Sequence, residues 1–295
     1  MSMKKLIIEV RANEYTMRDD NPNVPWTASE LGRDAYECLQ AGAAIYHYHA
    51  RGADGSPDHS ARGNAEAIRA IRDRASDLLI HPTLGWATVD ASPQKRMETI
   101  EELCTDPAVK PDFAPMDMGS ANVDLFDRSS GQFATDEVIY RNPTATLLYF
   151  AKRIPELGLK PYLSCWNIGF SRQIEAFASA GRLLEPLYMA FVLTDGRLIA
   201  GHPGTLNGLR AHLDFLPDGR NVEWTACNYG GDMLQILAPI IAQGGHVSIG
   251  LGDHGYRSFG LPTNADIVRF VADMASKMGR DIASPKEAKA MLGMK

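Results

Sequence analysis

The sequence predicts an α/β protein of the (β/α)₈ TIM-barrel class, built as a single domain over residues 1–295. Three observations predict it: eight short apolar runs, a helical stretch after each run, and a length that suits one barrel. A doubly wound open sheet is the alternative, but its first strand is usually followed by a glycine-rich turn. Here the first strand runs into Arg11-Ala12-Asn13-Glu14, without glycine.

The predicted strands are short and rich in apolar residues, and turn signals follow them. They cover residues 6–10, 43–49, 78–83, 112–118, 160–166, 187–193, 222–228 and 247–251.

Helix boundaries are predicted from capping residues. A helix over 28–40 should end at Gly42, and one over 232–243 at Gly244, because glycine accepts the left-handed conformation. Pairs of a capping residue and a proline predict three helix starts, at Ser92-Pro93, Asn142-Pro143 and Ser284-Pro285. The last pair predicts an extra C-terminal helix near 285–293. Residues 119–142 form a long loop, which we expect to be a lid or an oligomer contact.

Composition excludes several partner classes. With 30 Lys+Arg against 36 Asp+Glu, the net charge of −6 and the lack of a basic stripe argue against nucleic acid and against anionic membranes. No apolar run reaches the roughly 18 residues of a membrane span, and the first residues do not resemble a signal peptide. The four cysteines are far apart, as expected of reduced thiols. We therefore expect a cytoplasmic protein without nucleic-acid or membrane partners.

Polar residues gather at the predicted carboxyl ends of the strands, which is where barrel enzymes carry their active sites. In chain order they are Arg11, Asn13, Glu14, His47, His49, Arg51, His81, Thr83, Asp117, Ser120, Ser164, Cys165, Asn167, Thr194, Asp195, Cys227, Asn228, Asp253 and His254. This pattern predicts an active site at that end.

The segment Tyr46-His47-Tyr48-His49 is the most specific signal. Because side chains alternate along a strand, both histidines share one face, and the tyrosines should pack outward under the helices. Two imidazoles at this spacing can bind one metal ion, or they can serve as hydrogen-bonded polar residues of the barrel interior. Because alternate strands share a layer, Asp117 and Asp253 are the first candidates for a third ligand. His81 and Glu14 are weaker candidates.

Around these histidines the sequence resembles the β-keto acid cleavage enzymes, whose best-known type is 3-keto-5-aminohexanoate cleavage enzyme. The resemblance rests on Ala41–Arg51 (AGAAIYHYHAR) with Asp54-Gly55 after it, on Asn21–Pro25 (NPNVP), on Gly244-Gly245-His246 and on Thr263-Asn264-Ala265. These segments extend over nearly the whole chain.

The resemblance implies a (β/α)₈ barrel with a divalent metal, usually zinc, on His47 and His49. Such enzymes condense a β-keto acid with acetyl-CoA and release acetoacetate and a new acyl-CoA, and they tend to form oligomers. Asp253 matches an active-site aspartate, and Thr83 aligns with a substrate-binding serine. Glu14 lies within one residue of an acid that contacts the distal group of the substrate.

Three positions depart from the family pattern. Gly252 stands where the family has its third metal ligand, a glutamate; Ser248 stands where it has an arginine, and Ser164 where it has a supporting acid. We expect altered metal ligation and an altered substrate or mechanism.

The resulting hypothesis is a metal-dependent β-keto acid cleavage enzyme that uses acetyl-CoA and forms a homo-oligomer. Asp253 or Glu14 would move the proton, and Thr83, Asp117 and Asn228 would bind substrate. One alternative is an amidohydrolase-like metal hydrolase with His202 as a further ligand, and another is a barrel that binds ligand without catalysis.

Overall fold

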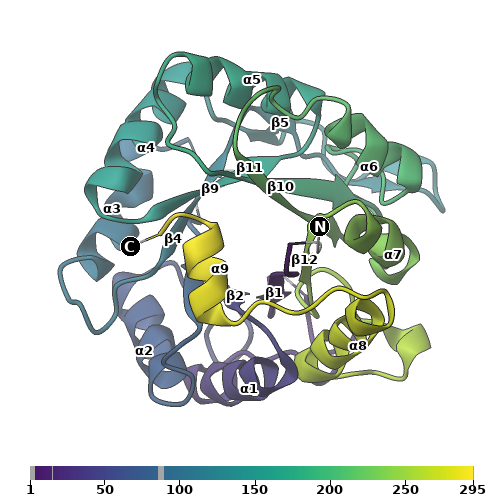
Figure 1. The fold of residues 1–295 in the computed structure, drawn as a ribbon. Helices are drawn as coiled ribbons and strands as arrows, with labels where there is room; N and C mark the ends of the chain where they lie inside the picture. Colours follow the sequence, from purple (N-terminus) through teal and green to yellow (C-terminus); the bar gives the residue numbers. More distant parts are fainter. Residues whose placement is uncertain (1–3, 15, 86–89, 295) are drawn as a thin grey trace.

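The computed structural model describes residues 4–14, 16–85 and 90–294, and these form a (β/α)₈ barrel (Figure 1). Eight parallel strands lie in the order β3-β2-β1-β12-β11-β10-β9-β4. The backbone N–H of Asp112, just before β4, donates to the carbonyl of Ile80 in β3 at 2.9 Å and joins the two ends of this order. The barrel strands are β1 (Ile8–Arg11), β2 (Ile45–Tyr48), β3 (Leu79–Pro82), β4 (Phe113–Asp117), β9 (Lys160–Cys165), β10 (Leu187–Thr194), β11 (Val222–Tyr229) and β12 (His246–Ile249).

Helices surround the strands, and one helix follows each of them. They are α1 (Ala28–Ala41), α2 (Ala61–Arg72), α3 (Pro93–Leu103), α4 (Thr144–Glu156), α5 (Ile168–Ser179), α6 (Leu206–Leu213), α7 (Leu234–Ala242) and α8 (Asn264–Lys277), with α9 (Pro285–Met291) at the end of the chain. The predicted fold class is confirmed, and each predicted strand lies within two residues of an observed one.

The capping predictions hold with one exception. Ser92 and Ser284 accept from backbone N–H groups at the starts of α3 and α9, and Gly42 closes α1 with a φ of 111°. The prediction that Asn142 caps a helix with Pro143 at its first position is wrong. Pro143 is itself the N-cap of α4, and the Asn142 side chain instead accepts from Arg96 Nη1 at 2.8 Å.

Helix α9 lies across the amino-terminal end of the barrel (Figure 1). Ala288 of α9 and Leu292, its C-cap, pack into a cluster with Ile7, Phe113 and Tyr188 at the starts of barrel strands. This packing fills that end of the barrel with apolar side chains, so the polar strand ends lie at the opposite end.

The long segment 119–142 has structure of its own. It contains two short antiparallel pairs, β5 (Ala121–Asn122) with β8 (Ile139–Tyr140), and β6 (Phe126–Asp127) with β7 (Gln132–Phe133). Its role as an oligomer contact stays a prediction.

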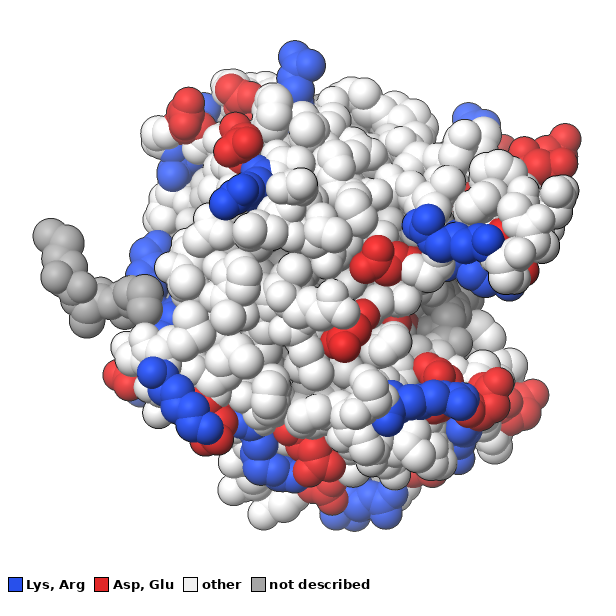
Figure 2. Space-filling view, turned by 90° about the vertical axis from the view of Figure 1, so that its right-hand side faces the viewer, with Lys and Arg blue, Asp and Glu red and all other residues white. Residues whose placement is uncertain are grey.

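Surface charge follows the near balance seen in the sequence. On the face in Figure 2, Lys and Arg side chains are interspersed with Asp and Glu. Within the described part of the chain, no helix has the length and apolar character needed to cross a membrane.

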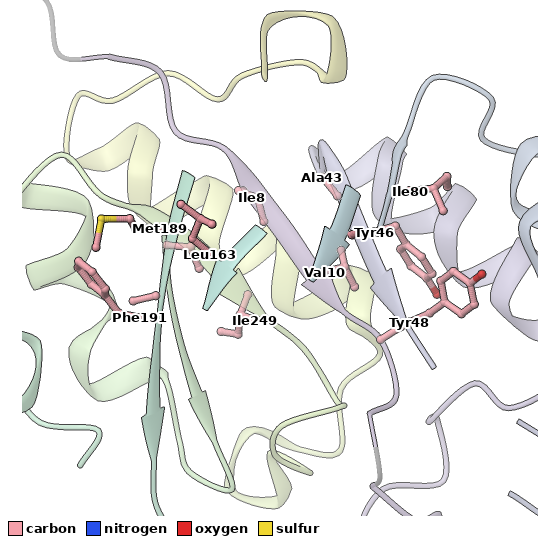
Figure 3. Close-up of a cluster of buried hydrophobic side chains, with 14 of the residues drawn as sticks. Ile8, Val10, Ala43, Tyr46, Tyr48, Ile80, Leu163, Met189, Phe191 and Ile249 are labelled. Atoms are coloured by element: carbon pink, nitrogen blue, oxygen red, sulfur yellow. The ribbon is translucent and has the colours of Figure 1, made fainter. Parts of the chain in front are cut away.

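Strand β2 is fixed in register by its outward face. Tyr46 and Tyr48 are fully buried and point away from the barrel interior (Figure 3). Both belong to the main hydrophobic core cluster, which is separate from the cluster under α9. Tyr46 Oη donates to Asp34 Oδ2 of α1 at 2.6 Å. Since alternate residues face opposite sides, this packing directs His47 and His49 to the interior, as predicted.

Candidate active site

A cavity of about 270 Å³ opens at the carboxyl ends of the strands. One side of it is formed by six polar residues of the described chain, which come from β1, β2, β3 and the loops after them. They are Arg11, Glu14, His47, His49, His81 and Thr83.

Three of these side chains converge. Glu14 Oε1 lies 2.8 Å from His47 Nε2, and Glu14 Oε2 lies 2.7 Å from His49 Nε2. One ligand atom from each of the three residues falls within 4.8 Å of the others, and all three residues are buried. Two imidazoles and one carboxylate are a common ligand set for a catalytic zinc ion.

The ring of His47 is held in an orientation that suits metal binding. Its Nδ1 lies 2.8 Å from the backbone carbonyl of His81, which can only accept, so Nδ1 carries the hydrogen. In the neutral ring the lone pair is then on Nε2, the atom that faces Glu14. Such a hydrogen bond on the far nitrogen is typical of metal-binding histidines.

Glu14 is ionised. Burial alone would raise its pKa, but Arg11 and the two histidines hold the pKa well below its usual range. Arg11 Nη2 lies 2.5 Å from Glu14 Oε1. Burial lowers the pKa of His49, although Glu14 opposes this shift, and the lowered pKa favours the neutral ring. An ionised carboxylate and neutral imidazoles are the forms that bind metal.

The backbone at Glu14 is strained, with a φ of 29°, a region that residues other than glycine rarely adopt. Arg51 holds this loop in place. Its Nη1 donates to Thr16 O at 2.8 Å and its Nη2 to Asn13 O at 2.7 Å, and its guanidinium also bonds to Glu14 O. The arginine two residues after His49 therefore positions the acid that faces the histidines.

Gly252, in the loop after β12, makes room for Glu14. A Cβ atom at this position would lie 2.6 Å from Glu14 Cγ and 2.8 Å from the Glu14 backbone nitrogen. Real Cβ atoms do not approach so closely, so any other residue here would displace Glu14.

We expect Gly252→Ala to weaken zinc binding by roughly 10–100-fold, because the orientation of the third donor is lost. The measurement is a zinc titration against a chromophoric chelator. Gly169→Ala is the matched control, since its added Cβ meets one side-chain oxygen, Asn167 Oδ1, at 3.0 Å. Equal zinc affinity in both variants would show that Glu14 does not need this space.

Arg11 joins the cluster to Asp253. Its Nε lies 2.9 Å from Asp253 Oδ1 and 2.7 Å from Oδ2. Burial raises the pKa of Asp253 to about 6, although Arg11 opposes this shift. Asp253 does not line the cavity itself; it lies behind Arg11, which does.

The arrangement in the structure favours a different third metal ligand from the one that the sequence favours. Asp117 and Asp253 were the first candidates, but the structure places Glu14 beside the histidines. Asp117 lines the cavity and is occupied, since Tyr140 Oη and Trp166 Nε1 donate to its two oxygens at 2.5 and 2.6 Å. Burial raises the pKa of Asp117. Asp253 is occupied by Arg11.

Two of the three predicted substrate-binding residues line the cavity, and the third does not. Thr83 and Asp117 line the cavity. Asn228 does not; its Nδ2 donates to Asp195 Oδ2 at 2.9 Å in the loop after β10. Its substrate-binding role stays a prediction without support from the cavity lining.

A second polar network, centred on Glu9, is not predicted from the sequence. Glu9 is fully buried in β1, and its carboxylate oxygens bond to His81 Nδ1 at 2.8 Å and to Tyr162 Oη at 2.7 Å. The sequence signal was a glutamate inside an apolar strand, with its neighbours Ile8 and Val10 both buried. This network fixes the ring of His81, whose carbonyl in turn orients His47.

Comparison with known proteins gives consistent matches. The family model for beta-keto acid cleavage enzyme matches residues 5–294. The chain is 30% identical over 296 residues to 3-keto-5-aminohexanoate cleavage enzyme of Fusobacterium nucleatum, with 99% of each chain covered. It is 26% identical over 284 residues to 3-oxoadipate:acetyl-CoA acetyltransferase of Cupriavidus necator, with 93% of this chain and 89% of the relative covered.

Among solved structures, the fold is similar to that of ObcA in a ternary complex with a C4-CoA adduct and oxalate. The TM-score is 0.69 at 12% identity, and the match covers 92% of this chain and 68% of that chain. At this identity the likeness shows the barrel fold alone.

Proposed function

The chain belongs to the β-keto acid cleavage enzyme family, and from this membership we propose that it transfers an acyl group between a β-keto acid and acetyl-CoA with the help of a divalent metal. The observation that carries the proposal is the convergence of Glu14, His47 and His49 in the cavity. The acetyl-CoA partner is supported by the name of the relative from Cupriavidus necator.

The residues present fit a metal ion. Glu14, His47 and His49 would hold it, and the nitrogen and oxygen donors favour Zn²⁺. When bound, the metal supplies a Lewis acid that polarises the keto group and lowers the cost of forming an enolate.

The other residues of the site bind and orient the substrate. Arg11 presents a guanidinium to the cavity, suited to the carboxylate of the keto acid, and Thr83 offers a hydroxyl. We assign the proton at C2 of the substrate to Asp253, whose pKa of about 6 suits a base near neutral pH. In this structure Asp253 lies behind Arg11, so it reaches C2 after Arg11 has turned toward the substrate carboxylate.

The reaction balances without an oxidant or reductant. The keto acid R–CO–CH₂–COO⁻ and acetyl-CoA give acetoacetate and R–CO–CoA. A new bond joins C2 of the keto acid to the acetyl carbonyl carbon, the bond between C2 and C3 breaks, and the CoA sulfur passes to the R–CO group.

This reaction is tested with keto acid labelled with ¹³C at C1 and C2, acetyl-CoA and zinc-loaded protein, followed by mass spectrometry. We expect both labels in acetoacetate and none in the new acyl-CoA. Zinc binding without turnover on any keto acid would instead favour the barrel that binds ligand without catalysis.

The amidohydrolase alternative finds no support. It needs His202 near the metal, but the His202 ring packs 5.0 Å from the ring of His212, which stacks on Phe191, and it does not line the cavity. Family membership also favours the keto acid reaction.

We expect Glu14→Gln to weaken zinc binding by more than about 100-fold, because the amide keeps the shape but removes the charge that faces both imidazoles. Zinc per chain after dialysis, measured by mass spectrometry, checks this. Glu287→Gln, which changes a partly exposed glutamate in the first turn of α9, far from the cavity lining, is the control. Full zinc content in Glu14→Gln would remove Glu14 from the ligand set.

A further inference from the structure

We propose that the keto acid substrate carries an uncharged, apolar group at the end distal to its carboxylate. The proposal rests on the function proposed above, which places the carboxylate and keto group beside the Glu14–His47–His49 cluster. It concerns the opposite side of the same cavity.

The two halves of the barrel line the cavity differently. The half made of β3, β2, β1 and β12 provides the histidines, Glu14 and Arg11. The half made of β11, β10, β9 and β4, with the loops above it, provides a group that we call the apolar wall: Val123, Leu125, Val192 and Leu198. Pro115, Ser164 and Trp166, also from this half, are uncharged.

Among the described residues, the one acid on this side of the cavity is already occupied. Both oxygens of Asp117 accept hydrogen bonds, from Tyr140 and Trp166. A substrate ammonium group could bind Asp117 only by displacing one of these donors, and the other acid of the cavity, Glu14, faces the histidines. A cationic tail therefore meets no unpaired carboxylate among the described residues that line the cavity.

An anionic tail lacks a partner as well. Among the described residues that line the cavity, Arg11 is the sole arginine or lysine, and the proposed function already assigns it to the carboxylate at the other end of the substrate. Arg96 does not line the cavity; its guanidinium carbon lies 5.7 Å from the centroid of the Tyr140 ring, and its side chain bonds to Asn142.

The apolar wall is built into the fold. Leu125 and Leu198 pair across an antiparallel bridge, and the N–H of Phe126 donates to Arg197 O at 2.8 Å. These bonds fasten segment 119–142 to the loop after β10. The predicted lid is thus attached at the cavity edge and presents Val123 and Leu125 to it.

An apolar tail gains from this surface by leaving water, at about fourfold in affinity per buried methylene group. A charged tail would lose its hydration without a compensating partner. The cavity therefore discriminates by tail polarity.

Three β-keto acids with the same six-carbon chain test this directly. They are 3-oxohexanoate, with an alkyl tail, 3-keto-5-aminohexanoate, with an ammonium group, and 3-oxoadipate, with a second carboxylate. With zinc-loaded protein and acetyl-CoA, we expect kcat/KM for 3-oxohexanoate to exceed both others by at least tenfold, with the difference mainly in KM. Equal or better use of a charged substrate would overturn the proposal and leave the proposed reaction standing.

Binding to the zinc-loaded protein, measured by calorimetry without acetyl-CoA, separates the two proposals. If no keto acid is turned over but 3-oxohexanoate still binds at least tenfold more tightly, the reaction is wrong and the tail preference stands. If a charged analogue binds as tightly as 3-oxohexanoate, or if none of the three binds, the tail preference is overturned.

A pair of variants on neighbouring residues tests the wall itself. Leu198 lines the cavity, whereas the side chain of Ile199 is 47% exposed and does not. We expect Leu198→Lys to shift the kcat/KM ratio toward 3-oxoadipate by at least tenfold, while Ile199→Lys keeps the ratio of the unmodified protein. A change of ratio cannot arise from partial unfolding, and an unchanged ratio in Leu198→Lys would remove the wall from substrate selection.

Discussion

Replacing His47 with alanine is expected to reduce zinc affinity by at least about 100-fold and to abolish formation of acetoacetate. The variant loses one of two imidazoles and leaves Glu14 Oε1 without its partner at 2.8 Å. Zinc content after dialysis and turnover with keto acid and acetyl-CoA are the two measurements. We expect both to fall together.

His202→Ala is the matched control, because this histidine packs against His212 outside the cavity lining. It should keep zinc and turnover. Full activity in His47→Ala would contradict the metal-dependent account, and loss of zinc in His202→Ala would revive the hydrolase alternative.

The second large effect is expected from Asp253→Asn. The variant keeps the size of the side chain but cannot accept a proton, so kcat should fall by roughly 10²- to 10⁴-fold. Zinc content should be unchanged, because Asp253 bonds to Arg11 and is not among the three grouped metal-binding residues.

Exchange of the C2 hydrogens with D₂O, followed by NMR without acetyl-CoA, measures proton removal by itself. After the uncatalysed exchange rate is subtracted, we expect the exchange rate in Asp253→Asn to fall in proportion to kcat. Exchange at the rate of the unmodified protein would show that Asp253 acts solely by orienting Arg11, and a raised KM with normal kcat would support that role.

Much of the fold follows from sequence periodicity. The eight strands were predicted because buried parallel strands form short apolar runs, and Ser92, Ser284 and Gly42 mark helix ends through local chemistry. The prediction that Asn142 caps a helix is wrong because Arg96, from α3, donates to its side-chain oxygen. That contact is 46 residues distant in the sequence and leaves no local signal.

The site was predicted where it depends on strand alternation. The outward tyrosines and inward histidines of β2 follow from a period of two, and the structure has them so. The sequence gives Glu14 little weight as a ligand, because it lies in a loop with a positive φ, where strand alternation does not predict the direction of a side chain. The position of Glu14 depends on the hydrogen bonds that the Arg51 side chain makes to this loop and on the absence of a Cβ atom at Gly252.

The apolar wall was not predicted at all. Leu125 and Leu198 come from two loops whose pairing depends on the assembled barrel. Their hydrophobicity alone would equally suit the core, so the sequence offered no signal for a role in the cavity.

An anomalous difference map at the zinc absorption edge, from crystals grown with zinc, tests the central claim most directly. The account predicts one strong peak within bonding distance of the Nε2 atoms of His47 and His49 and of the Glu14 carboxylate. No peak there at saturating zinc, or a peak coordinated by Asp253 or Asp117 in place of Glu14, would contradict it.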